Sequence, residues 1–171
     1  MVSVTAPLSS RAFNCHPEPV EGSPNQNQIQ KATMPEPLTK EEVLSKIEND
    51  ESLVGLEIGN VDFRNHHFKQ KVDFTRARFT GSTNFEKAQF LNDTSFFKAK
   101  FSGETNFSAT EFASVADFSL TTFSGEKLAS FTKAIFSVGV SFALARFLNK
   151  GGVSFQLATF AAQNTVLFVA A

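Results

Sequence analysis

Phenylalanine recurs along this chain every five or six residues, and each pair of intervals adds up to a repeat of about eleven residues. Twenty phenylalanines lie between Phe63 and Phe168. Once Phe97 is set aside, the intervals between them alternate between 5 and 6, with three intervals of 8 toward the end. A strand repeats every 2 residues and a helix every 3.6, so neither explains this spacing. A unit that buries one large side chain on each of several flat faces does explain it, and we therefore predict a solenoid of stacked coils.

The aromatic composition indicates that the interior of this solenoid is dry. The 171 residues include 21 Phe but no Tyr and no Trp. A buried Tyr hydroxyl or Trp N–H needs a hydrogen-bond partner, whereas a buried Phe ring does not. The length is that of one ordinary domain.

The formal charge of -1 hides two regions of opposite sign. Residues 1–60 contain 4 Lys and Arg against 9 Asp and Glu, whereas residues 61–171 contain 12 against 8. The leader is therefore acidic and the repeat region mildly basic, at +4. A nucleic-acid-binding domain usually has a pI above about 9, so nucleic acid is not the partner we expect.

Cysteine usage and hydropathy bear on the compartment. Cys15 is the only cysteine, which rules out a disulfide within the chain. The sequence contains no run of about 18 apolar residues and no apolar stretch typical of a signal peptide. We therefore expect a cytoplasmic protein without a membrane span.

The chain divides into three predicted zones. Residues 1–37 are rich in Pro, Ser, Asn and Gln and should form a disordered leader. This leader resembles translated dispersed bacterial DNA repeats, in which case Met34 would be the true start; a disordered functional tail is the alternative. Residues 38–50 are predicted to form a capping helix, and residues 51–171 the repeat.

The helix prediction depends on a capping box and one apolar face. Thr39 is the expected N-cap and Glu42 follows it at the third helical position. Val43, Leu44 and Ile47 share one face, which we expect to cover the open end of the solenoid. A partner-binding helix is the alternative reading.

The repeat resembles the pentapeptide-repeat family, specifically its phenylalanine-rich branch. The central residue of each unit is Phe, as at Phe74 and Phe79, and a small residue stands two positions earlier, as at Val72 and Ala77. The residue between them is often Asp, Asn or Ser, as at Asp73. The resemblance covers about two thirds of the chain.

This resemblance implies an all-β solenoid, a right-handed quadrilateral β-helix with four faces per coil. Alternate units have an extra residue, so a coil should contain about 22 residues, with bulges at two of its four corners. The intervals of 8 after Phe123, Phe147 and Phe160 should form larger bulges. This register also predicts two columns of rings, one made of Phe63, Phe85 and Phe107 and the other of Phe79, Phe101 and Phe123.

The residues that most often carry chemistry have structural explanations here. His66 falls on an inward position and His67 on an outward one, with too few further ligands for a metal site. Asp62, Asp73 and Asp117 should accept hydrogen bonds from corner backbone. We expect no catalytic, cofactor or metal residues and no small-molecule substrate. Four glycines recur after every fourth face, and we predict that they occupy corners with positive φ: Gly81, Gly103, Gly125 and Gly151.

One surface feature is a candidate binding site. Arg78, Lys100 and Arg146 each precede a Phe of the same column, and Thr122 completes that set. Arg76 and Lys98 flank them. We predict that these five cations form a basic stripe on one face; ordinary solubilising charge is the favoured interpretation, and a surface that binds an anionic partner is the alternative.

The function favoured by these features is a non-enzymatic interaction or scaffold module with an unknown protein partner. One alternative is a duplex-DNA mimic that acts on gyrase or another topoisomerase. Another is an accessory module of a larger membrane or signalling protein, in which the native chain continues past Ala171. The apolar residues 166–171 could also join two copies end to end as a homodimer.

Overall fold

The computed structural model describes residues 36–161 and 166–167, all of which belong to the compact unit Pro35–Ala171. The predictions for Cys15, for a start at Met34 and for disorder before residue 36 lie outside the described residues. So do the predicted bulge after Phe160 and the side chains of residues 166–171.

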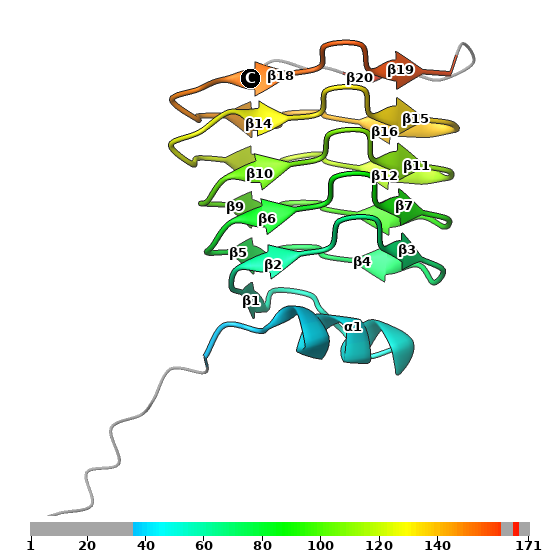
Figure 1. Ribbon diagram of the computed structural model, residues 1–171, viewed down its shortest axis with the longest axis vertical. Helices are drawn as coiled ribbons and strands as arrows, with labels where there is room; N and C mark the ends of the chain where they lie inside the picture. Colours follow the sequence, from blue (N-terminus) through cyan, green and yellow to red (C-terminus); the bar gives the residue numbers. More distant parts are fainter. Residues whose placement is uncertain (1–35, 162–165, 168–171) are drawn as a thin grey trace, which may run out of the picture. The chain divides into compact units, whose positions relative to one another are not determined.

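The described part begins with one short helix, α1 (Lys40–Glu48). The predicted capping box is present: the backbone N–H of Thr39 donates to Glu42 Oε2 at 2.8 Å, and the N–H of Glu42 donates to Thr39 Oγ1 at 3.3 Å. Val43 and Ile47 are buried within the hydrophobic core. The helix therefore covers the first coil, as Figure 1 shows at the lower end of the stack.

The strands form four parallel sheets with one strand from each coil in every sheet. Sheet A consists of β1 (Glu57–Ile58), β5 (Arg78–Phe79), β9 (Lys100–Phe101), β13 (Thr122–Phe123) and β17 (Arg146–Phe147). Sheet B consists of β2 (Val61–Asp62), β6 (Thr83–Asn84), β10 (Thr105–Asn106), β14 (Ala129–Ser130) and β18 (Val153–Ser154).

The chain then passes to the other two sheets before it returns to sheet A. Sheet C consists of β3 (His67–Phe68), β7 (Gln89–Phe90), β11 (Glu111–Phe112), β15 (Ile135–Phe136) and β19 (Thr159–Phe160). Sheet D consists of β4 (Val72–Asp73), β8 (Thr94–Ser95), β12 (Val115–Asp117), β16 (Gly139–Ser141) and β20 (Val166–Leu167). Four faces per coil confirm the quadrilateral solenoid, and Figure 1 shows its coils stacked one above another.

The extra residues lie at two of the four corners, as predicted. Intervals of 5 turn the chain from sheet B to C and from D to A, whereas the longer intervals lie at the A–B and C–D corners. The bulges after Phe123 and Phe147 both fall at the A–B corner. There the Nδ2 of Asn149 donates to the carbonyl of Lys127 at 3.1 Å, so the two bulges stack.

The interior is a set of stacked phenyl columns. Phe107 is fully buried, and its ring centroid lies 4.9 Å from that of Phe85 and 4.9 Å from that of Phe131. In the next column Phe101 lies 4.4 Å from Phe79. The small residues two positions before the core Phe residues from Phe74 to Phe142 are buried beside the rings, which leaves room for this packing. Both predicted columns are thus confirmed.

Candidate functional site

Three cations of the predicted basic stripe lie in one column on sheet A. Arg78 pairs in parallel register with Lys100, Lys100 with Thr122, and Thr122 with Arg146. Each precedes a Phe that points inward, so each side chain points outward. Adjacent coils are about 4.8 Å apart, so the three steps from Arg78 to Arg146 span about 14 Å.

The other two cations of the stripe lie at the adjoining D–A corner. Arg76 and Lys98 have φ values of +59° and +57°, and each holds the third position of a tight turn. The turns stack, because the N–H of Arg76 donates to the carbonyl of Phe97 at 2.8 Å. The Nζ of Lys98 lies 5.0 Å from the centre of the Phe97 ring. The fold therefore brings all five cations to one edge of the solenoid.

Most of these cations have no carboxylate neighbour. Arg78 forms an ion pair with Glu57 of the preceding coil, with Nη2 2.8 Å from Oε1. Within the described residues, the other four stripe cations have no carboxylate oxygen within 4.0 Å. The positive charge of the stripe is thus only partly compensated.

The sequence analysis missed two residues of this edge. Leu120 and Leu144 hold the same turn position as Arg76 and Lys98, with φ values of +57° and +56°. Both side chains are partly exposed. The signal was present in the sequence, because each stands two residues after a Phe at the start of a five-residue interval.

The candidate carboxylates stabilise the corner turns, as predicted. Asp73 Oδ1 accepts the N–H of Thr75 at 2.9 Å, and Asp117 Oδ1 accepts that of Ser119 at 2.8 Å. Asp62 Oδ1 accepts the N–H of Arg64 at 3.1 Å. The side-chain hydrogen bond from Arg64 also lowers the pKa of Asp62 below its ordinary value. These carboxylates therefore serve the backbone rather than form a pair for acid–base catalysis.

The two histidines have the orientations that the sequence predicted. The ring of His66 is half-buried and lies edge-on to Phe68 at 4.6 Å, whereas His67 is exposed. Burial lowers the pKa of His66, with smaller contributions from Lys40 and His67. Within the described residues, no group of three or more His, Cys, Asp or Glu is placed to hold a metal ion.

The prediction that the recurring corner glycines have positive φ is wrong. Among the described glycines, only Gly55 and Gly152 have positive φ. Gly103 is instead required by close contact between coils, since a Cβ there would overlap the carbonyl of Gly81. A Cβ on Gly125 would likewise overlap the carbonyl of Gly103. A Cβ on Gly151 would lie 2.5 Å from the backbone N of Leu128. Apart from Asp50, Gly55 and Gly152, the described residues with positive φ are non-glycine residues at the two five-residue corners.

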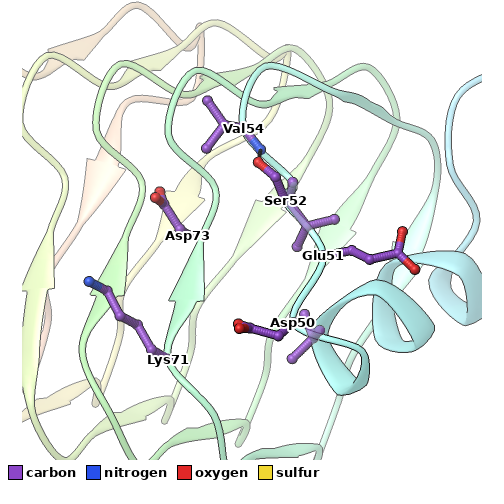
Figure 2. A pocket seen from close by; sticks show the side chains of 8 residues that line it. Asp50, Glu51, Ser52, Val54, Lys71 and Asp73 are labelled. Carbon is purple, nitrogen blue, oxygen red and sulfur yellow. Dashed lines mark hydrogen bonds between the residues drawn. The ribbon is translucent and has the colours of Figure 1, made fainter.

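A hollow of about 300 Å³ lies between the segment after α1 and β4. Its lining residues are Ile47, Asp50, Glu51, Ser52, Leu53, Val54, Lys71 and Asp73. Figure 2 shows the Asp50 carboxylate directed toward the segment that carries Lys71 and Asp73, while Glu51 turns toward the helix. Glu51 pairs with Lys46 at 2.7 Å. The hollow contains charges of both signs but no nucleophile paired with a base.

A second hollow of about 440 Å³ lies between α1 and β3. Leu44, Ile47 and Phe68 supply its apolar wall, and Glu48, His66, His67, Lys69 and Gln70 complete the lining. A third hollow, of about 170 Å³, lies on sheet B around Asn84 and Asn106. Neither brings together a recognisable catalytic set.

Comparison with known proteins agrees with the geometry. Residues 63–111 match the family model described as pentapeptide repeats in nine copies. Residues 63–111 are therefore pentapeptide repeats, and the same phenyl spacing continues in register through the later coils. No curated protein and no solved structure matches the chain.

The fold of this family is a structural and interaction fold, and the chain is accordingly a repeat-protein module. Across residues 36–161 and 166–167, α1 is too short and too polar to cross a lipid bilayer, and no longer apolar helix is present.

Proposed function

We propose that this solenoid is a non-enzymatic binding module that holds an anionic partner through the basic stripe. The observation that carries the proposal is the parallel register, which aligns Arg78, Lys100 and Arg146 on one face beside Arg76 and Lys98. A column of like charges at fixed spacing raises the local potential and attracts an opposite charge. A rigid scaffold also holds these side chains in place before the partner arrives.

The charge distribution does not favour a duplex-DNA mimic. Such a protein needs a strongly acidic surface, whereas residues 61–171 carry a net charge of +4. We therefore expect no effect of this protein on supercoiling by gyrase, with or without a quinolone.

The test compares two triple variants with the same change in net charge. Arg78→Glu, Lys100→Glu and Arg146→Glu reverse the stripe; Lys87→Glu, Lys127→Glu and Lys133→Glu reverse three lysines outside it. We expect the stripe variant to elute from an immobilised polyglutamate column at clearly lower salt than the wild type, with the second variant close to the wild type. Equal loss in both variants would mean that binding depends on net charge alone, and would refute the proposal.

A further inference from the structure

The edge that carries the basic stripe is also apolar along its later coils. At the D–A corner the turn position is occupied in successive coils by Arg76, Lys98, Leu120 and Leu144. The two leucines are each 37% exposed. The turn cations and the two turn leucines thus lie along one line parallel to the solenoid axis, and the three cations of sheet A lie in the adjoining column.

The diagonally opposite B–C corner has similar residues but a different electrostatic character. In successive coils its turn position holds Asn65, Lys87, Ala109, Lys133 and Leu157. There, however, Lys87 lies 4.0 Å from Glu86, and Arg64 forms an ion pair with Asp62 at 2.7 Å. The D–A corner has no such ion pair among its described turn residues, and it adjoins the three cations of sheet A. Lys133 has no ion pair among the described residues and lies one coil before the exposed Leu157, so a charge and a leucine also meet at the B–C corner. The D–A edge differs because it adjoins the three cations of sheet A.

The shape of this edge limits the kind of partner. A corner is convex, and no stripe residue lines any of the three hollows described above. Peptide recognition usually needs a groove or an exposed strand edge. Sheet A offers neither along this line, because its inner strands are paired on both sides. A broad, deformable and negatively charged surface fits a straight convex edge better than a peptide does.

We propose that the D–A edge docks on an anionic lipid bilayer, with Leu120 and Leu144 entering the headgroup boundary and the stripe cations contacting lipid phosphates. This inference rests on the proposed function, because it names the anionic partner of the same stripe. Exposed leucines gain by leaving water at the acyl boundary, and nearby Arg and Lys are attracted to anionic headgroups. Their long aliphatic stems allow the charged ends to remain at the phosphate level.

The experiment is co-sedimentation of the full chain with vesicles of phosphatidylcholine alone or mixed with phosphatidylserine. We expect binding only to the mixed vesicles, weakening as salt rises. Arg78→Glu, Lys100→Glu and Arg146→Glu together should lower partitioning about a hundredfold or more. Leu120→Asn with Leu144→Asn should lower it about tenfold. Asn tolerates positive φ, so this pair should still fold, which circular dichroism would verify.

Matched controls make the result specific to this edge. Lys87→Glu with Lys133→Glu, and Leu157→Asn, change the same residue types at the same turn position of the B–C corner. These variants should bind mixed vesicles as the wild type does. Absence of vesicle binding by the wild type at low salt, or an equal loss in the controls, would refute the bilayer as the partner. Unchanged binding by the variant with Leu120→Asn and Leu144→Asn would refute it as well.

Failure of this inference and failure of the proposed function give different results. If the stripe variant loses retention on polyglutamate while the wild type ignores mixed vesicles, the stripe binds an anionic protein surface and the bilayer is excluded. If the stripe variant behaves as its control in both assays, both proposals are wrong.

Discussion

Gly103 lies directly above Gly81 at the A–B corner, so close that a Cβ on Gly103 would overlap the carbonyl oxygen of Gly81 and approach the N of Ser82 to 2.8 Å. Neither glycine has positive φ. The pair therefore shows that the corner requires the absence of a side chain, rather than a special backbone conformation.

Gly103→Ala should destabilise the solenoid by about 1–3 kcal/mol, because the new methyl group forces two coils apart. Urea unfolding would measure this. Gly139→Ala is the control, since a Cβ at Gly139 meets nothing within 4 Å and its φ is not positive. That variant should be neutral or stabilised by up to about 1 kcal/mol. A similar loss in both variants would refute the contact explanation.

Ala109 and Ala113 allow a test of the left-handed turn position. Ala109 has a φ of +53°, whereas Ala113 is not among the positive-φ residues, and both are partly exposed. Replacing Ala109 by Gly relieves left-handed strain worth about 1–2 kcal/mol. This gain in the free energy of unfolding should exceed the loss caused by the greater freedom of Gly in the unfolded chain. Ala109→Gly should therefore raise the melting temperature slightly and Ala113→Gly lower it. The opposite order would contradict the assigned turn.

Phe107→Ala should cost about 3–5 kcal/mol, because it leaves a cavity in the middle of a column. Phe107 is fully buried and stacks on both Phe85 and Phe131. Phe97, half-buried in the D–A corner turn, is the control. Its replacement by Ala should cost about 1 kcal/mol or less. A melting temperature unchanged by Phe107→Ala would be incompatible with the packing described here.

His66 should make stability depend on pH. Burial lowers its pKa below the ordinary value of 6.5, so the folded state binds fewer protons than the unfolded state. The free energy of unfolding should then fall as the pH drops from about 6.5 through the folded pKa. His66→Gln should flatten this part of the profile. An NMR titration of His66 at or above 6.5 would show that the assigned environment is wrong.

The sequence alone was sufficient for the coil and its core. One Phe per face can be buried only when coils stack, so the alternating intervals predicted a solenoid. The resemblance to pentapeptide repeats supplied the four faces per coil, and with them the 22-residue register of the phenyl columns. Asp73 and Asp117 were likewise assigned correctly, since a short acidic side chain can bond the backbone two residues on without help from distant residues. The capping box of Thr39 and Glu42 is equally local.

Contacts between coils are the part that only the tertiary structure decided. The role of Gly103 depends on how closely the carbonyl of Gly81 approaches along the axis, which no local pattern encodes. Neutralisation of Arg78 by Glu57 depends on the coil beneath it. The alignment of Leu120 and Leu144 with Arg76 depends on turns stacked 22 to 24 residues apart. Local chemistry thus determined the repeat, whereas the surface it presents was decided by stacking of residues far apart in the chain.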